Sequence, residues 1–416
     1  MLNLNMVNKL ILILACLTLS SCAVETVQQL PEDPIERYAG SYSPYRYGDL
    51  TDTDAPSGYK PFYISHYSRH GSRYLIHEED FDVVASLEEY ADEGHLTDKG
   101  MKLLADLQCL RDKHVRMHSH LTLKGGSQQQ DIAERMAKRF PQVFAKGGKV
   151  RCVSSPAQRC NQSLANFALS LASEHTELDF SIYSGHRYYD IISARIKDAE
   201  KRAHYAQIRD SIVVAEGSPI LAVKELFLQP EKMQVDWTCL THSVYTLCCA
   251  MQCQDYDAPA MDTYFTEEQL EILWKAENAF DYGVFCDRET FGDYRIDHVA
   301  RPILKEIIDQ AEYALTTGNR VADLRFGHDS GLSPLLTLMG FEDYVQVDPA
   351  EAWKIWRNHE KVCMASNIQI VFYKHRSKEI LVKILRNEQE AVLPALEPVI
   401  GPYYSWNNLK DYLLSR

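Results

Sequence analysis

The short segment 69–73 carries residue types that can do chemistry on an anion. Its sequence is Arg-His-Gly-Ser-Arg, so His70 lies between Arg69 and Arg73 and precedes a glycine that lets the backbone approach a ligand closely. Planar guanidinium groups suit the several oxygens of a phosphoryl group, and a neutral imidazole can attack phosphorus to form a phosphohistidine. A solvated turn rich in arginine and histidine could have the same five residues. Other residues of the chain are therefore needed to distinguish an anion site from such a turn.

Two later groups of residues favour an anion site. Arg159 follows a β-prone run at 150–154 and falls in the first turn of a predicted helix, where it could add a third guanidinium beside a positive helix end. His328 and Asp329 follow another β-prone run, so a second imidazole could bind phosphate while the carboxyl protonates the leaving alcohol. Each group alone is a weak signal, because an isolated His-Asp pair is usually a surface or capping pair.

The predicted elements place all three groups at the ends of strands. The β-prone runs 62–67, 150–154 and 321–326 each end just before one group, and the two later helices open at Ser155-Pro156 and at Ser333-Pro334. Ligands of open α/β sheets bind at the carboxyl edge of the strands. We therefore expect the three groups to converge there.

The pattern along the chain predicts an α/β fold with a mainly parallel sheet and helices on both faces. This core is expected from 56–174 and 297–416, with a helical cap inserted at 175–296, where the pattern is mostly helical and shows no clear strand. Residues 22–55 are rich in Pro, Asp, Ser and Tyr without periodicity and predict a tether.

The first 21 residues have the features of a secretory signal peptide. Lys9 precedes an apolar run at 10–19, which is too short to span a bilayer, since spanning takes roughly 20 apolar residues. The ending Leu-Ser-Ser-Cys at 19–22 resembles a bacterial lipobox and predicts a lipid anchor on Cys22. We expect an exported bacterial lipoprotein, periplasmic or associated with the outer membrane; ordinary cleavage without a lipid is the alternative.

Composition limits the possible partners. Among 416 residues, 44 Lys and Arg face 58 Asp and Glu, a net charge of -14, so the chain has no general attraction for nucleic acid and must meet an anion with a local basic pocket. Of 11 cysteines, nine remain after residue 22, and an oxidising compartment would allow disulfides among them. The cysteines at 248, 249 and 253 lack a second cluster at zinc spacing, so we expect neither a metal nor a cofactor.

The order of these motifs resembles the histidine phosphatase superfamily, in its acid phosphatase and phytase branch. That branch is identified by an early Arg-His-Gly-x-Arg and a late His-Asp, and its Leu-Thr-x-x-Gly motif matches 121–125. The resemblance covers most of the chain after the tether and implies a phosphoglycerate mutase-like core with a helical cap. It also implies that His70 is the nucleophile and Asp329 the proton donor. The phosphate pocket that it implies is formed by Arg69, Arg73, Arg159 and His328.

Within the branch, the chain looks most like the multiple inositol-polyphosphate phosphatases. The similarity lies in Phe-Gly-His at 326–328, the run 335–340 and the late Asn-Glu at 387–388. That subfamily usually has His-Ala-Glu where this chain has His-Asp-Ser at 328–330, the form of ordinary acid phosphatases and many phytases. The difference bears on which phosphate is removed, because either acid can donate a proton. Leu75 stands where many members have proline, which matters little to the chemistry.

These inferences predict an exported, metal-independent phosphomonoesterase that acts through a phosphohistidine on phytate or another inositol polyphosphate. The alternatives are a broad acid phosphatase acting on sugar phosphates or nucleotides, and a catalytically silent lipoprotein that binds phosphorylated ligands. A protein that only binds phosphorylated ligands needs neither a nucleophile nor a proton donor, so the motifs favour a catalytically active protein. Cap residues that could meet the outer phosphates of the substrate, or could simply be solvated, are Arg187, Arg195, Lys197 and Arg202. The oligomeric state does not follow from the sequence.

Overall fold

The structure is a computed structural model that describes residues 35–416 apart from 47, 49, 51 and 293. The predicted signal peptide, the predicted anchor at Cys22 and the first part of the predicted tether lie outside the described residues. Among the helices of the described part, none combines the length and the apolar character that crossing a membrane requires.

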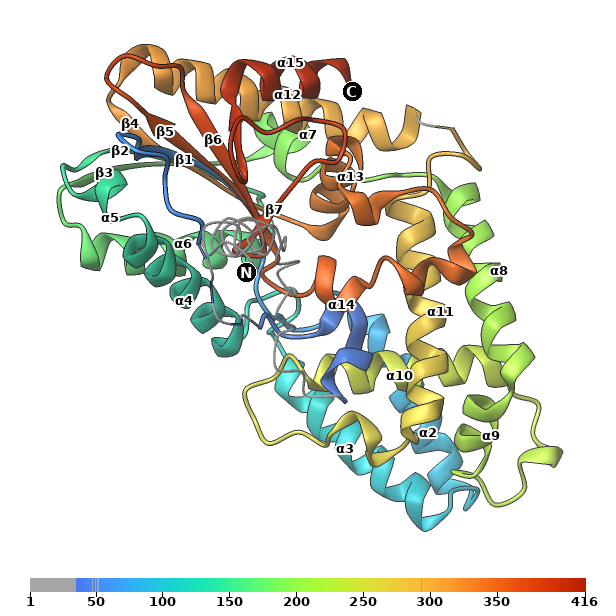
Figure 1. Cartoon of the computed structure of the whole chain (residues 1–416). Helices are drawn as coiled ribbons and strands as arrows, with labels where there is room; N and C mark the ends of the chain where they lie inside the picture. The colour runs from blue at the N-terminus through green and yellow to red at the C-terminus, as the bar shows by residue number, and fades with distance from the viewer. Residues whose placement is uncertain (1–34, 47, 49, 51, 293) are drawn as a thin grey trace, which may run out of the picture.

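One eight-stranded sheet forms the centre of the fold (Figure 1). Its order is β3-β2-β4-β1-β5-β6-β7, with β8 also beside β6. The first four strands in this order are parallel to one another, and the others are antiparallel to their neighbours. This mixed sheet, flanked by helices, confirms the predicted α/β class. The strands are β1 (Lys60–Arg69), β2 (Gly148–Ser154), β3 (Leu178–Ser184), β4 (Arg320–Gly327), β5 (Asn367–Lys374), β6 (Leu381–Arg386), β7 (Gln389–Ala391) and β8 (Tyr403–Ser405).

Helices cover both faces of the sheet, which is why the central strands are buried over nearly their whole length instead of alternating. On one face, Ile64 of β1 and Leu324 of β4 pack with Phe167 of α6 (Gln158–Glu174), together with α4 (Leu123–Arg139) and α5 (Pro141–Phe144). The other face is covered by α7 (Tyr189–Ile192), α12 (Tyr294–Thr317), α13 (Asp329–Met339) and α15 (Trp406–Ser415).

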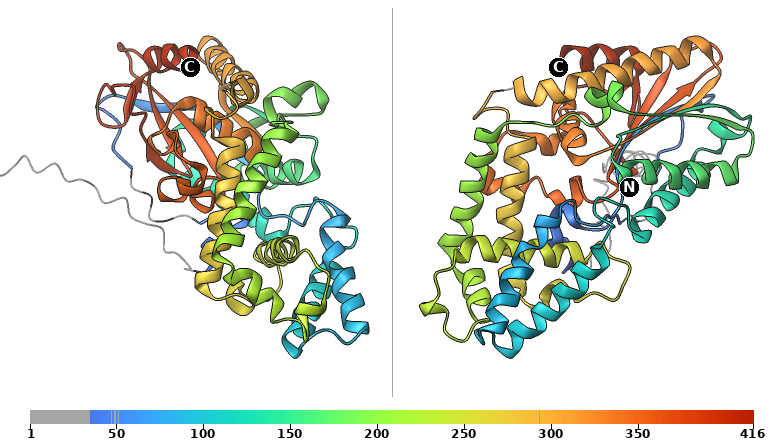
Figure 2. Two further views of the ribbon diagram at one scale, coloured as in Figure 1. Left: turned by 90° about the vertical axis from the view of Figure 1, so that its right-hand side faces the viewer. Right: turned by 180° about the vertical axis from the view of Figure 1, so that it is seen from behind.

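A helical lobe with its own apolar core lies away from α15 (Figures 1 and 2). Helices α8 and α11 pack side by side and run from the sheet region into this lobe. The lobe contains α2 (Asp82–Asp92), α3 (Asp98–His114), α8 (Ala199–Glu216), α9 (Ser218–Lys224), α10 (Trp237–Met251) and α11 (Glu267–Phe285). The short helices are η1 (Glu36–Tyr42), η2 (Glu78–Phe81), η3 (His186–Tyr188), η4 (Pro230–Lys232), η5 (Met261–Thr263), η6 (Glu342–Tyr344), η7 (Pro349–Lys354) and α14 (Asn358–Lys361).

The lobe differs from the single cap insertion that the sequence predicts at 175–296. Helices α2 and α3, expected in the core, belong to the lobe, because Leu103 and Leu107 pack with Leu226 and Leu247. Strand β3, inside the expected cap, is instead an edge strand of the sheet. The helices α2 and α3 and the helices α8 to α11 thus come to the lobe from two separate stretches of the chain, and a third stretch, which contains η1, joins them.

The described end of the predicted tether is folded. Residues 36–42 form η1, and Tyr38 and Ala39 are buried in the lobe core. The Tyr245 hydroxyl of α10 donates a hydrogen bond to the carbonyl of Tyr38. The tyrosines that made this stretch look like a linker thus bury aromatic surface, so its end belongs to the domain.

Candidate active site

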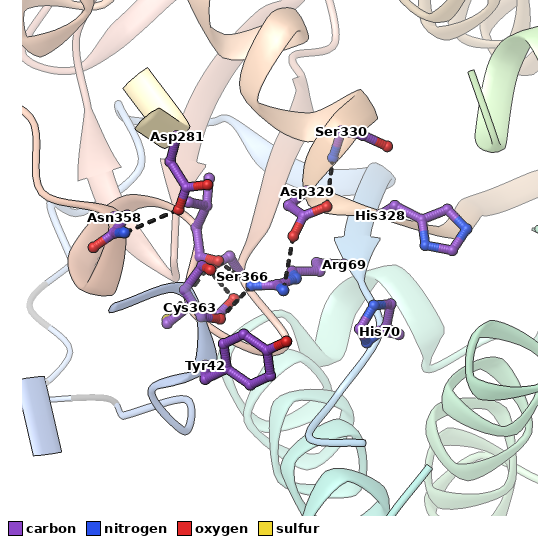
Figure 3. A network of polar contacts seen from close by, with 12 residues as sticks. Tyr42, Arg69, His70, Asp281, His328, Asp329, Ser330, Asn358, Cys363 and Ser366 are labelled. Atoms are coloured by element: carbon purple, nitrogen blue, oxygen red, sulfur yellow. Dashed lines mark hydrogen bonds and ion pairs between the residues drawn. The ribbon is translucent and has the colours of Figure 1, made fainter. Parts of the chain in front are cut away.

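The register of the parallel strands brings the predicted site residues together. Arg69, at the end of β1, lies opposite Gly327 of β4, and Ser154, at the end of β2, lies opposite Phe326. The rings of His70 and His328, which follow these strands, have centroids 5.6 Å apart (Figure 3). The sequence-based expectation that the motifs meet at the carboxyl edge therefore matches their placement in the structure.

Tight backbone packing shapes the loop that carries His70. A Cβ atom at Gly71 would lie 2.3 Å from the carbonyl oxygen of Gly125, so a larger residue would separate this loop from α4. Thr122, the N-cap of α4, accepts from the amide of Gly125 at 3.1 Å and donates to the carbonyl of Ser72 at 3.0 Å. The Leu-Thr-x-x-Gly motif is thus the surface against which the His70 loop packs.

His70 has the geometry of a neutral nucleophile. Its Nδ1 donates to the carbonyl of Gly71 at 2.9 Å, which leaves the lone pair on Nε2 for attack. Burial, followed by the positive charges of Arg159 and Arg69, holds the pKa of His70 well below its ordinary value. Both effects favour the neutral imidazole.

His328 is held by Arg159 and by two serines that no motif indicates. Its Nε2 is hydrogen-bonded to the Ser155 hydroxyl at 2.9 Å, and Ser155 in turn accepts from the Ser193 hydroxyl at 2.8 Å. The Nη2 of Arg159 lies 3.3 Å from His328 Nδ1. Burial and Arg159 lower the pKa of His328 to about 3. We expected Ser155 only as a helix cap, but α6 has no side-chain cap and the hydroxyl orients the second imidazole instead.

Asp329 forms an ion pair with Arg69 (Figure 3). Its Oδ2 lies 2.7 Å from Arg69 Nη2, and its Oδ1 accepts from the amide of Ser330 at 2.7 Å at the start of α13. Burial alone would raise the pKa of Asp329, but Arg69 and His328 lower it more strongly, and the net effect is a lowered pKa. The ion pair with Arg69 thus favours the carboxylate form of Asp329.

The three arginines keep hydrogen-bonding capacity for a ligand. Arg69 donates from Nη1 to the carbonyls of Ser41, at 2.6 Å, and Val362, and Arg73 lies over the Tyr42 ring. The Nε groups of Arg69, Arg73 and Arg159 are buried and have no hydrogen-bond partner among the described residues. Buried N–H donors are normally satisfied, so three such groups around two imidazoles fit the oxygens of a phosphoryl group.

The four expected cap residues are all exposed, but they differ in position. Arg187 lies over the Tyr188 ring at 4.7 Å and Arg202 over the Phe280 ring at 5.2 Å. Lys197 lies over the Tyr189 ring at 5.6 Å. Only Arg195 is among the main charges that lower the pKa of His328. Arg195 is therefore the best placed of the four to meet a second phosphate.

The nine cysteines of the described part are all free thiols. Cys248, Cys249 and Cys253 are buried, and the residues that the structure describes contain no group of three His, Cys, Asp or Glu side chains arranged to hold a metal ion. Cys160 packs beside the site, with its Sγ 3.7 Å from His328 Nε2.

Comparison with known proteins gives relatives in both sequence and fold, whereas no family model matches the chain. The chain is 24% identical over 327 residues to multiple inositol polyphosphate phosphatase 1 of Gallus gallus, which covers 70% of this chain and 68% of that protein. Its fold matches the multiple inositol polyphosphate phosphatase of Bifidobacterium longum in complex with inositol hexasulfate, with a TM-score of 0.77, 18% identity and coverage of 91% and 97%.

The fold also matches a phytase from D. castellii, with a TM-score of 0.67, 13% identity and coverage of 92% of this chain and 85% of that one. A Hafnia alvei phytase matches with a TM-score of 0.56, 12% identity and coverage of 87% of this chain and 98% of that one. These matches confirm the resemblance inferred from the motifs. By sequence and by fold, the chain is similar to the multiple inositol polyphosphate phosphatases, and by fold it is also similar to phytases.

Proposed function

We propose that this chain hydrolyses phosphomonoesters of inositol polyphosphates through a phosphohistidine on His70. Its relatives are inositol polyphosphate phosphatases and phytases, which makes it a histidine-type phosphatase. The observation that carries the proposal is the His70 imidazole, with Nε2 available, close to three arginines whose Nε groups are buried and have no partner among the described residues. A site that only bound phosphate would have no need of a nucleophile placed this way.

In the first step, Nε2 of His70 attacks phosphorus and the bond from phosphorus to the leaving oxygen breaks. The arginines and His328 stabilise the charge on the transferring phosphoryl oxygens, and Asp329 gives its proton to the leaving alkoxide. In the second step, water attacks the phosphohistidine, Asp329 takes a proton from that water, and inorganic phosphate leaves with His70 neutral again. No step requires a metal ion.

Asp329 must gain a proton before it can donate one. Its lowered pKa depends on Arg69 and His328, the same groups that a bound phosphate uses. A phosphate dianion competes for Arg69 and places negative charge beside the carboxylate, and both effects raise the pKa of Asp329. Substrate binding thus prepares the donor.

Support for an inositol polyphosphate comes from the relatives and from Arg195. The Bifidobacterium longum protein was solved with inositol hexasulfate and with phosphate, which supports a small phosphorylated substrate here. In a chain of net charge -14, an exposed arginine near His328 is a specific attraction for a second phosphate on the same ring.

Phosphate release from phytate, glucose phosphate and a nucleotide tests the substrate. We expect the highest kcat/KM for phytate, and Arg195→Ala should reduce that value while leaving glucose phosphate unchanged. Arg202→Ala, the loss of another exposed arginine, on α8, is the control. Equal kcat/KM on all three substrates would establish the broad acid phosphatase instead, and tight phosphate binding without any turnover would establish a silent binder.

We also propose that the protein is exported and anchored through a lipid on Cys22, with a periplasmic or outer-membrane location. The support is the signal-like segment 1–21 and its Leu-Ser-Ser-Cys ending. Cys22→Ser should move the protein out of the membrane fraction or block its maturation, whereas Cys16→Ser should not. An unchanged membrane distribution would favour ordinary cleavage or another attachment.

A further inference from the structure

A buried asparagine connects the helical lobe to the active site. Asn358, at the start of α14, is 1% exposed and makes three hydrogen bonds to α11. Its Nδ2 donates to Asp281 Oδ2 at 2.9 Å, its Oδ1 accepts from Trp274 Nε1 at 2.9 Å, and its backbone amide donates to Asn278 Oδ1 at 2.8 Å. Both ends of the amide are used, so Asn358 fixes α14 on α11.

Asn358 also supports the two carbonyls that hold Arg69. Gly40 packs against it so closely that a Cβ atom there would lie 2.9 Å from Asn358 Nδ2, and the next carbonyl, that of Ser41, accepts from Arg69. The carbonyl of Asn358 accepts from the amide of Val362 at 2.9 Å, and the carbonyl of Val362 accepts from Arg69. The position of the Arg69 guanidinium therefore depends on the Asn358 contacts.

Asp281 is a second carboxyl group close to the Arg69–Asp329 pair. Figure 3 shows Asp281 and Asn358 on one side of Arg69 and the two imidazoles on the other. Burial raises the pKa of Asp281 to about 7; the Asn358 hydrogen bond opposes this effect, as does Arg69, while Glu277 and Asp329 add to it. Asp281 and Asp329 thus lie in the field of one arginine and repel each other when both are charged.

Few other charges bear on Asp281. Its field also acts on the Cys286 thiol of α11 and the Tyr245 hydroxyl of α10, both with a raised pKa. Charged groups on the other elements around α11 form ion pairs with carboxylates other than Asp281: Arg209 of α8 and His242 of α10 with Glu277, Lys354 of η7 with Glu351, Arg37 of η1 with Glu267, and Arg357 of α14 with Glu360.

We propose that Asp281, held by Asn358, is a positioning residue by which the helical lobe controls the protonation of the proton donor Asp329. The inference rests on the proposed function. When Asp281 is charged, it competes for Arg69 and repels a charge on Asp329, so Asp329 in the substrate complex keeps its proton to higher pH. Below its own pKa, Asp281 is neutral and no longer raises the pKa of Asp329. At such low pH, Asp329 in the substrate complex keeps its proton without that effect.

The test is the pH dependence of kcat for Asp281→Asn on phytate, from pH 4 to 9. We expect most of the wild-type kcat at pH 5 and an alkaline limb about 1 pH unit lower, a typical shift from one neighbouring charge. Along that limb, kcat should fall about tenfold below wild type. Asp281→Glu restores an ionising carboxyl and should move the limb back. Glu271→Gln, an exposed change on the same helix, is the matched control.

Two comparisons make the test decisive. In an Asp329→Asn background, Asp281→Asn should no longer shift the limb, because the group it acts on is gone. A loss of kcat that is uniform from pH 4 to 9 would show a merely structural role, and an unshifted limb would overturn the proposal as well. If the wild-type protein releases no phosphate at all, the proposed function fails; a wild-type enzyme that is active but insensitive to Asp281 rejects this inference alone.

Discussion

Replacing Asp329 by asparagine tests the proposed proton donor separately from the groups proposed only to bind phosphate. The amide keeps the size of the side chain but loses the negative charge 2.7 Å from Arg69. General acid catalysis contributes about 10²–10⁴-fold, so kcat on phytate should fall by about 100-fold or more. Because p-nitrophenolate leaves without a proton, kcat on p-nitrophenyl phosphate should fall much less.

The same change should alter stability and binding in opposite directions. Arg69 is 2% exposed, and breaking a buried ion pair costs about 3–5 kcal/mol. The loss should be at the lower end of this range, because the carbonyls of Ser41 and Val362 still accept from Arg69. Inorganic phosphate should bind the variant more tightly, since it no longer competes with a carboxylate for Arg69, and should restore more stability to the variant than to wild type.

The assay measures kcat on both substrates and the thermal midpoint with and without phosphate. Asp309→Asn, an exposed change on α12, is the control for loss of an aspartate charge. Equal losses of kcat on phytate and on p-nitrophenyl phosphate would show that Asp329 only orients Arg69 and His328, and that another group donates the proton.

His70→Ala should abolish turnover while phosphate still binds, as measured by phosphate release and calorimetry; near-normal kcat would refute the nucleophile. Arg159→Ala should weaken phosphate binding by about 1.5–3 kcal/mol, the value of a charged hydrogen bond, and an unchanged affinity would place it outside the pocket. Dialysis against EDTA should leave activity intact, because arginines supply the positive charge; activity that returns only with added zinc or magnesium would contradict the mechanism. The pKa of His328 is about 3, against about 6.5 when unfolded, so the unfolded chain binds more protons between these values and the free energy of unfolding should rise with pH across this window. Urea unfolding at pH 4 and 7 measures this rise, which His328→Gln should reduce; an identical rise in the variant would show that His328 is not its source.

The sequence was most informative where chemistry depends on side chains at strand ends. His70, Arg159 and His328 could be placed in one site because strands that precede them were expected to be parallel neighbours, and the β1–β4 register brings their ends together. The parts of the site that are formed by backbone groups cannot be recognised from residue types in the sequence. The carbonyls of Ser41 and Val362 hold Arg69, yet any residue type supplies a carbonyl, so no motif could have pointed to them.

The extent of the lobe was predicted less well for a related reason. An apolar stripe shows that a helix has a buried face, but it does not identify the partner, so α2 and α3 were assigned to the core that follows them in sequence. Strand β3 is largely exposed and lacks a buried face, so its residues carry little of the alternation that indicates a strand. Asp281 comes near Arg69 only because of where α11 lies in the folded chain.

The way Arg69 is held also sets when this molecule can first be active. Its guanidinium contacts residues 41, 329 and 362, and β4, from residue 320 onward, must insert between β2 and β1. A growing chain that already contains the motif at 69–73 therefore has no assembled pocket until nearly the whole polypeptide has been made. An incomplete chain therefore cannot hydrolyse phosphate esters, even after the motif at 69–73 has been made, because activity depends on segments from both ends of the sequence.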